Sequence, residues 1–558
     1  MTTALTNTFL DHFDPVRLFG PIFDKELRVS SRRKRNYVLR FAYILVLSIF
    51  IVSIWYSTIG IRSSGSTVYQ ISRFSSAGRH IMTTIAWFQF IAAQLIAIVM
   101  LSSSVSDEIR TGTLSVLMTT PISSFQIVTG KLLGKLLQLM VLLAISLPLL
   151  AIIRIFGGVP WDYVVSSVCI TMTAVMLAGT VSLMLSMIYR HSYTVVMMTI
   201  LGYLLVFCAL PGIFNMLAVK GVFIFDRQVT QSLLALINPF VAFAATNGIL
   251  LQSGVPKFFS WPLHCLIMLA VAAVLMTISI WRVRKAALGQ AFGGSCKLWS
   301  GRIFKRRARS NLDNAGSILP VTGPPIVWKE MRKGFVGHSR TDRIMTIMLI
   351  VLFCLAAILL LLSPRNNIIP TLLILGLYWI AMIRIAVFSA GSIADEKEAR
   401  TWPVLLATPL DGKDIVRGKA VAAFRRNVPL LLLYLVLMCI SYIIIGMRAF
   451  PQILISLPIT AVDMVCSIIF LAGMGMYFGV RLKTTTTAVA ATVGSYLIMT
   501  SLFRGVFSIS FRLLFSAIGS SWFIWVFHGT SIISSLAMGG IGIYQIRCAE
   551  RRVRRNIF

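Results

Sequence analysis

The sequence predicts an all-α integral membrane protein of about 12 transmembrane helices, arranged as two parallel six-helix repeats, each preceded by an interfacial amphipathic helix. Three observations favour this class: a mean hydropathy of +0.85, only 13% charged residues in a chain of 558, and a polar segment that occurs twice at a constant spacing. Soluble domains contain about a quarter charged residues. A chain this apolar is therefore expected to lie in a lipid bilayer.

The apolar runs define the expected spans, because a membrane-crossing helix needs about 20 mostly apolar residues. Six runs precede the midpoint of the chain and six follow it, near residues 41–60, 81–104, 132–154, 163–188, 193–217, 259–281, 344–363, 371–393, 428–447, 453–479, 486–508 and 522–546. The first run is longer than the apolar core of a signal peptide and follows a basic cluster at 32–35. We therefore expect it to remain as a membrane helix with its N-terminus in the cytosol.

The charge distribution supports this topology. Lys and Arg total 52 against 18 Asp and Glu, a formal net charge of +34. Such an excess can indicate nucleic-acid binding, but the cations lie at the ends of apolar runs, as the positive-inside rule requires. We therefore expect no nucleic-acid partner, contact of the cations with membrane lipid, both termini in the cytosol, and a bacterial cytoplasmic (inner) membrane location.

The chain divides into two similar halves. We expect a first six-helix half over residues 1–285, a basic cytosolic linker over 286–323 and a second six-helix half over 324–558. A Lys-Glu-x-Arg sequence begins at Lys25 and again at Lys329, in segments predicted to lie in the cytosolic interface. Because each half contributes an even number of spans, the halves should be parallel repeats.

The repeated segment lies between the second and third span of each half. It reads DEIRTGTLSVLMTTPISSFQIVTGK over Asp107–Lys131 and DEKEARTWPVLLATPLDGKDIVRGK over Asp395–Lys419, a constant offset of 288 residues. In each copy a Thr-Pro pair should end a short helix, because proline restricts its predecessor. A second helix should begin at Ser123 or Asp411, residue types that cap helix N-termini. The predicted topology places both copies in the cytosol, as a helix–turn–helix suited to docking.

The pattern acidic–x4–5–(G)T–x2–LL–x–TP–x5–IV–x–GK, at this place between spans, resembles the permease of type-2 ABC transporters, here as two six-span units fused in one chain. In that family this loop carries the coupling helix that docks on the ATP-hydrolysing subunit. The resemblance implies docking contacts at Glu108, Thr113, Leu117, Thr120, Pro121, Glu396, Thr401, Leu405, Thr408 and Pro409.

The resemblance further implies an exporter with a separate ABC-type ATPase subunit in two copies. The sequence agrees with this division of labour, because Gly130-Lys131 and Gly418-Lys419 lack the spacing and hydroxyl residue of a phosphate-binding loop. We expect no enzymatic activity and no cofactor in this chain, with ATP bound by the partner. The second copy has Arg400 in place of Gly112 and Trp402 in place of Leu114, so we expect weaker docking there.

Ionisable residues inside predicted spans are further candidates, since charge is costly in a bilayer. Arg384 lies about 16 Å from Asp395 by helical rise, and Asp463 lies within the tenth span. We favour a structural pair between them over a proton or substrate site. Gln94 and His264 are weaker candidates. The eight cysteines and six histidines are scattered, so no disulfide framework, metal site or catalytic cluster is expected.

Two other functions stay open. A secondary transporter driven by an ion gradient also uses parallel six-span repeats, but it needs intramembrane carboxylates, and Asp463 is nearly alone. A membrane-embedded enzyme ranks third, because no acid/base or metal cluster is visible. Two apolar outer segments, 232–249 and 508–521, are expected to be re-entrant or surface helices. Nothing in the spans specifies the cargo.

Overall fold

The structure is a computed structural model. It describes residues 21–26, 28, 37–38, 40–41, 43–45, 47–48, 51–52, 67–155, 159–189, 191–219, 227–251, 259–291, 323–331, 340–362, 368–445, 450–482, 484–485, 487–500 and 523–554. Every regular element in these ranges is a helix, which confirms the predicted all-α class.

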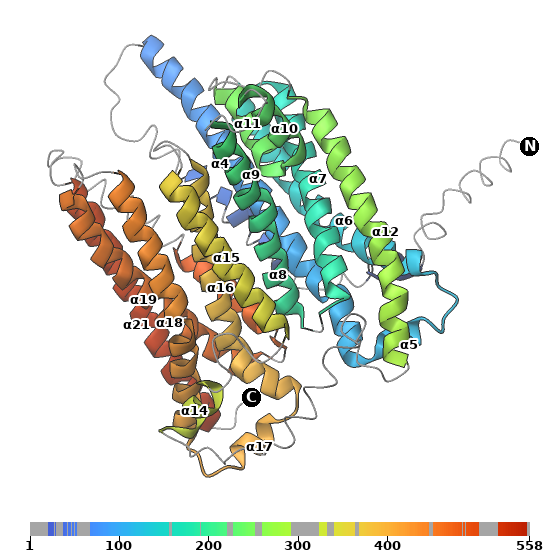
Figure 1. The fold of residues 1–558 in the computed structure, drawn as a ribbon, viewed down its shortest axis with the longest axis vertical. Helices are drawn as coiled ribbons and strands as arrows, with labels where there is room; N and C mark the ends of the chain where they lie inside the picture. Colours follow the sequence, from blue (N-terminus) through green and yellow to red (C-terminus); the bar gives the residue numbers. More distant parts are fainter. Residues whose placement is uncertain are drawn as a thin grey trace, which may run out of the picture. The chain divides into compact units, whose positions relative to one another are not determined.

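The long helices follow the expected spans (Figure 1). Their bounds are α4 Thr67–Thr111, α6 Ser124–Ile155, α7 Trp161–Ser186, α8 Ser192–Leu204, α9 Leu210–Val219, α10 Arg227–Ile237, α11 Pro239–Leu251, α12 Trp261–Ala291, α15 Arg340–Leu362, α16 Ile368–Glu398, α18 Gly412–Ile445, α19 Phe450–Arg481 and α21 Phe523–Arg554. Shorter elements are α5 Thr113–Leu117, α14 Pro325–Met331 and α17 Trp402–Leu406.

Ten helices among the described residues are long and apolar enough to cross a membrane, or eleven if a bent pair counts as one span. The predicted spans 41–60 and 486–508 lie partly outside the described residues. The described part of the second of these is the shorter apolar helix Thr487–Thr500. The protein is therefore a multi-pass membrane protein. The observed helices extend beyond the apolar runs at their polar ends, because helical hydrogen bonding continues into the interface.

The fifth predicted span contains a π-helical turn, Leu205–Ala209, between α8 and α9. Pro211 is the second residue after this turn. Proline has no amide N–H and its ring crowds the carbonyl four residues earlier, so the hydrogen-bond ladder is displaced by one residue upstream. Such single-turn π-bulges keep a helix continuous past the interruption.

The chain forms two compact units. One contains residues 1–199 and 228–319, and the other contains residues 200–227 and 320–558. We refer to them as unit 1 and unit 2. The segment 200–227, which includes α9, thus packs with the C-terminal part of the chain. The division predicted at residues 285 and 323 stays a prediction.

Unit 1 contains a bent helix pair. α10 and α11 meet at 118°, and Asn238 at the bend accepts a hydrogen bond from the Phe240 amide through its side-chain oxygen (2.9 Å). The buried His264 of α12 lies 2.8 Å through Nδ1 from the Leu236 carbonyl oxygen, which satisfies the end of α10. The apolar segment 232–249 is therefore a bent helix pair, which is either a broken span or a re-entrant loop; the predicted re-entrant or surface helix stays a prediction.

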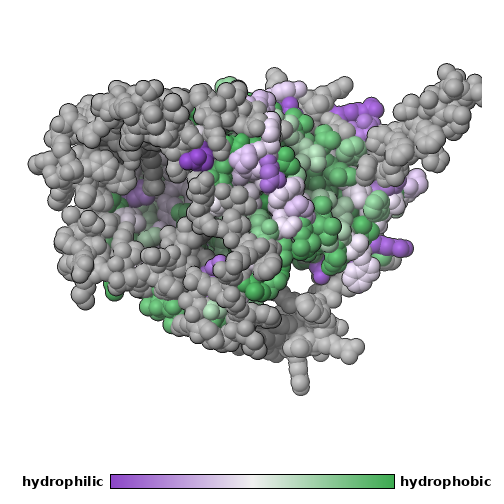
Figure 2. Space-filling view, turned by 90° about the horizontal axis from the view of Figure 1, so that it is seen from above, coloured by the Kyte–Doolittle hydropathy of each residue, from purple (hydrophilic) through white to green (hydrophobic). Residues whose placement is uncertain are grey.

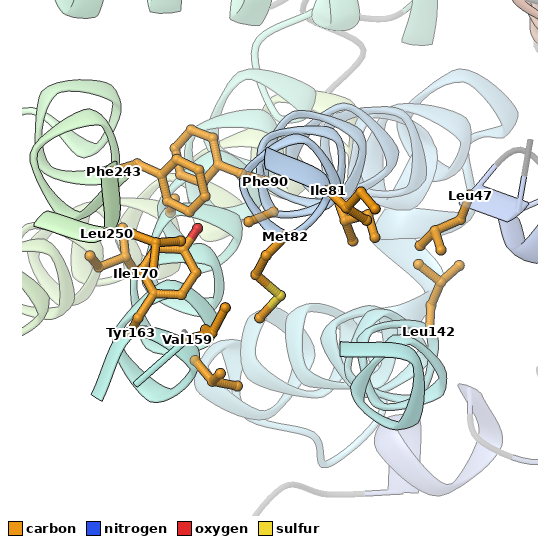
Figure 3. Packing of buried hydrophobic residues seen from close by; sticks show 14 of the residues in the cluster. Leu47, Ile81, Met82, Phe90, Leu142, Val159, Tyr163, Ile170, Phe243 and Leu250 are labelled. Carbon is orange, nitrogen blue, oxygen red and sulfur yellow. The ribbon is translucent and has the colours of Figure 1, made fainter. Parts of the chain in front are cut away.

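Aromatic packing holds this pair against the long helices (Figure 3). Phe243 of α11 stacks on Phe90 of α4 with ring centroids 4.3 Å apart, and the Tyr163 hydroxyl of α7 donates to the Asn247 side-chain oxygen (2.6 Å). The bend is therefore covered by protein, as backbone inside a membrane requires. The corresponding prediction for residues 508–521 lies outside the described residues.

Unit 2 contains a close helix pair, α19 and α21. A Cβ added at Gly473 would lie 2.0 Å from the Gly542 carbonyl oxygen, and one added at Gly542 would lie 2.5 Å from the Ile469 carbonyl oxygen. The two backbones are therefore in direct contact, which small residues allow in membrane helices.

The remaining helix faces are apolar and exposed, as lipid contact requires. α12 exposes Leu266 (64%) and Val274 (58%), and the coloured residues in Figure 2 include broad apolar areas. Such surface would be unfavourable in water.

Candidate functional site

The first repeated loop begins where α4 ends at Thr111 (Figure 1). Gly112 adopts the left-handed conformation (φ 79°), which redirects the chain into the five-residue helix α5. The Thr120 hydroxyl donates to the Leu117 carbonyl (2.5 Å) and so satisfies the end of α5 before Pro121. The predicted short helix and its Thr-Pro end are confirmed.

A capping box starts the next helix. The Gln126 amide donates to the Ser123 hydroxyl and the Ser123 amide donates to the Gln126 side-chain oxygen, both at 3.2 Å. This reciprocal pair satisfies two N–H groups at the start of α6. The predicted N-cap at Ser123 is confirmed.

One fully buried leucine anchors the loop. Leu114 of α5 has no exposed surface and packs with Val105 of α4, Val128 of α6 and Val283 and Ala287 of α12. A helix of five residues is unstable alone. Its position is therefore set by this contact with three long helices.

The second loop follows the same path with different residues. Arg400 adopts the left-handed conformation (φ 56°) at the position equivalent to Gly112. Trp402 takes the place of Leu114, is 4% exposed, and packs with Ile393, Val416, Ala549 and Val553. Here too a threonine hydroxyl, that of residue 408, donates to the carbonyl three residues earlier (2.6 Å).

The lysine that ends each loop motif points inward. The Lys131 ammonium lies 2.5 Å from a Glu108 carboxylate oxygen and 2.5 Å from the Ser104 carbonyl oxygen. The Lys419 ammonium lies 3.0 Å from Glu396 and 2.6 Å from the Ser392 carbonyl oxygen. Only 4% and 2% of these lysine side chains are exposed. We call each lysine with its glutamate and carbonyl partners a lysine node. The node links α4 to α6 in unit 1 and α16 to α18 in unit 2.

In unit 1 the N-terminal helical segment contacts α6 one turn after Lys131. Glu26 pairs with Lys135 of α6 at 2.8 Å. Gly134 permits this approach, because a Cβ there would lie 2.9 Å from the Glu26 Cβ.

In unit 2 the short helix α14 takes this place. Lys329 lies 3.5 Å from Glu396, and Glu330 lies 4.0 Å from Lys419. Gly418 faces Ile326, whose Cβ would be 3.0 Å from an added methyl group. Each predicted interfacial helix thus contributes ion pairs beside its repeated loop, through Glu26 in unit 1 and through Lys329 and Glu330 in unit 2, a placement that sequence spacing alone could not provide.

The aspartate before each glutamate binds the start of the fifth predicted span. Asp107 accepts a hydrogen bond from the Ser192 hydroxyl (3.2 Å), and Asp395 accepts one from the Thr485 hydroxyl (2.8 Å). Ser192 and Thr485 are 293 residues apart, so the equivalence of the two units continues beyond the loop with a small change in offset.

The outward surface of each loop is centred on a valine that the sequence-based prediction missed. Val116 is 65% exposed and Val404 is 69% exposed. Each lies two residues after a buried anchor, which places it on the opposite side of a helix. The offset of 288 residues and this spacing were the signals that could have identified both.

The predicted docking residues divide into three groups. Exposed ones are Thr113, Thr120, Pro121, Thr401 and Pro409; half-buried ones are Leu117, Leu405 and Thr408; the inward ones are Glu108 and Glu396. The two leucines pack against their unit's core, and the two glutamates hold the buried lysines. Contact of all ten with a partner stays a prediction.

The predicted intramembrane pair is buried. Arg384 is 2% exposed, with its guanidinium carbon 5.4 Å from the Phe388 ring centroid. Asp463 is 9% exposed and accepts a hydrogen bond from the Ser535 hydroxyl (2.6 Å). Pairing of Arg384 with Asp463 stays a prediction. Gln94 donates to the Phe90 carbonyl of its own helix (3.1 Å), which is a structural contact.

Within the described residues, no three His, Cys, Asp or Glu side chains gather as a metal site. The seven cysteines in these ranges are free thiols. Each loop therefore consists of an exposed apolar surface, a buried anchor residue and a lysine–glutamate ion pair. Such a loop is suited to binding a partner and to passing a movement on to the helices that it joins.

Comparison with known families agrees with this arrangement. Residues 21–288 match the model of a family described as ABC-2 family transporter protein. The first half of the chain belongs to the ABC-2 transporter family. The match ends near the C-terminus of α12 and includes the loop 107–131. ABC-2 permeases are transport subunits that act with an ATP-binding partner. A search of curated proteins found no match for the chain.

Proposed function

We propose that this chain is the membrane-spanning permease of an ABC exporter in the bacterial inner membrane, with both termini in the cytosol. It is coupled to two separate ATPase subunits through loops 107–131 and 395–419. The observation that carries the proposal is the repeated loop geometry: each unit has a left-handed residue, a buried anchor, an exposed valine and an inward lysine at equivalent positions.

The loop has the parts that a mechanical coupler needs. Val116 and Val404 present an apolar contact outward, while Leu114 and Trp402 fix the short helix to the unit's core. Movement of the loop is carried to the spans because packed helices shift between discrete arrangements instead of deforming continuously.

The lysine–glutamate nodes make this connection stiff. Lys131 and Lys419 each join the helix before the loop to the helix after it. A partner that binds one conformation of the loop more tightly will therefore shift the conformation of two spans together. ATP binding and hydrolysis belong to the partner, and cargo moves through the membrane part of this chain.

A gradient-driven transporter is the second candidate, favoured by the buried carboxylate of Asp463. Such a transporter needs an intramembrane group that exchanges its proton or ion during each cycle. Asp463→Asn separates the two functions. It should leave ATP-dependent transport within about twofold of wild type, and it should abolish transport driven by a gradient.

The experiment that tests the main proposal is co-purification of the tagged full chain from its own membranes. The chain should retain ATPase subunits, and the purified chain alone should hydrolyse no ATP. The double variant Val116→Asp, Val404→Asp should retain at least tenfold less ATPase, because it places charge in an apolar contact. The matched variant Val116→Thr, Val404→Thr keeps the shape and should retain most of it.

The folding control is elution of each variant as a single species from size-exclusion chromatography. A folded aspartate variant that keeps its full ATPase content contradicts docking through these loops. ATP hydrolysis by the chain alone contradicts the division of labour.

A further inference from the structure

The two loops share a backbone path but differ in surface charge. Between Arg110 and Lys131 the first loop contains no charged residue. At equivalent positions, 288 residues later, the second loop has charged side chains: Arg400 for Gly112, Lys413 for Phe125, Asp414 for Gln126 and Arg417 for Thr129. The surface offered by each loop is therefore chemically distinct.

The last helix adds to the charge beside the second loop. Arg417 pairs with Glu550 of α21 at 2.7 Å, and Asp411 pairs with Arg554 at 3.7 Å. Val553 packs against Gly412, where an added Cβ would lie 2.9 Å from its Cγ1. The end of α21 is thus a fixed part of this surface.

Unit 1 has no equivalent of these ion pairs among its described residues. Val283 and Ala287 of α12 occupy the place of Ala549 and Val553, so the equivalents of Glu550 and Arg554 are Arg284 and Leu288. The equivalents of Arg417 and Asp411 are Thr129 and Ser123. Because these two residues are uncharged, neither ion pair can form in unit 1.

The ion pairs neutralise part of the charge around the second loop and leave a cationic rim. Arg400 is exposed and Lys413 is half-buried, and neither belongs to an ion pair of the described residues. Arg551 is exposed as well, but its counterpart in unit 1, Lys285, is also an exposed cation, so the difference between the two surfaces rests on Arg400 and Lys413. Asp414 is exposed on the adjacent turn. The first loop presents Val116, which is 65% exposed, and Phe125, which is 49% exposed.

One socket cannot fit both surfaces well. A socket lined with carboxylates would match the second loop but leave those charges desolvated and unpaired over the first loop. An uncharged apolar socket would bury Arg400 and Lys413 without partners. Discrimination of this kind, in which a fit to one partner is a misfit to another, is how interfaces achieve specificity.

We infer that the two loops bind two different ATPase chains. Loop 107–131 takes an uncharged apolar socket, and loop 395–419 with the end of α21 takes a socket with an acidic rim. The inference rests on the proposed function and specifies its partner as a heteromeric ATPase pair.

The test uses native mass spectrometry of the tagged full chain purified from its own membranes. We expect two ATPase subunits of different mass. Raising salt from about 0.1 M to about 1 M should weaken retention of one subunit roughly tenfold, because screening reduces contacts between exposed charges. The other subunit should change by less than about twofold.

Variants assign each subunit to its loop. Arg400→Glu with Lys413→Glu should remove the salt-sensitive subunit and leave the other, whereas Val116→Asp should remove only the salt-insensitive one. Arg343→Glu changes an exposed cation at the start of α15, outside both surfaces, and should remove neither.

The outcomes separate this inference from the proposed function. A single ATPase mass present in two copies, lost in parallel with salt, overturns the inference and leaves the ABC function intact. Absence of any ATPase from the purified wild-type complex overturns the proposed function itself. Loss of both subunits from the folded Arg400/Lys413 variant also overturns the inference.

Discussion

The two repeated loops reach one geometry with different side chains. Gly112 and Arg400 both adopt the left-handed conformation, and Leu114 and Trp402 both fill the space beneath the short helix. The inward lysine and the threonine at the end of the short helix, which fix the backbone, stay the same, and so does the exposed valine. Other positions, including the left-handed one, are charged in the second copy and neutral in the first. The comparison separates what positions a loop from what the loop presents.

The largest expected effect tests the lysine nodes. Lys419→Met leaves the Glu396 carboxylate, 17% exposed, without its closest cation, and removing one partner of a buried pair costs about 3–5 kcal/mol of unfolding free energy. Lys131→Met should cost less, because 30% of the Glu108 side chain is exposed and water can solvate it. Chemical unfolding in lipid or detergent micelles measures both.

A double variant provides the control for that comparison. Lys419→Met with Glu396→Gln removes both charges and should recover part of the lost stability. Equal losses in the two units would contradict the role assigned to exposure.

An intermediate effect tests the close helix pair of unit 2. Gly473→Ala places a methyl group 2.0 Å from the Gly542 carbonyl oxygen, and overpacking of this kind costs about 1–3 kcal/mol. At the offset of 293 residues, the equivalent residue of unit 1 is Thr180. It already carries a side chain, and its hydroxyl donates a hydrogen bond to the Leu177 carbonyl of its own helix. Thr180→Ala should cost no more than about 1 kcal/mol.

Gly494→Ala is the matched control, because nothing lies within 4 Å of its added Cβ. It should leave the thermal midpoint unchanged or raise it, since alanine favours a helix. A Gly473→Ala midpoint equal to that of wild type would refute the direct contact of α19 with α21.

We expect the smallest effect from variants that exchange the left-handed residues between the two loops. Arg400→Gly should stabilise the protein and Gly112→Arg should destabilise it, each by about 1 kcal/mol, because residues with a Cβ are strained at positive φ. The thermal midpoint in the presence and absence of the ATPase partner measures this. Changes of the same sign in both variants would show that the two loops do not share a backbone path.

Local signals in the sequence were enough to predict the membrane class of this protein and the secondary structure of its repeated loops. The lengths of apolar runs, the Thr-Pro pairs and the capping residue Ser123 predicted the membrane class and the short helix–turn–helix, because these features act over a few residues. The offset of 288 residues located both loops. The ABC-2 resemblance was also visible in the loop motif itself, and the family match over 21–288 confirms it.

Tertiary structure decided which side chains turn inward and which face a partner. Glu108 was predicted as a docking contact, yet its carboxylate pairs with the buried Lys131 of unit 1. Val116 was not among the predicted docking residues and is 65% exposed. The sequence could not reveal either fact, because each depends on packing between helices far apart in the chain: Leu114 settles against α12, and this contact turns the opposite face of α5 outward.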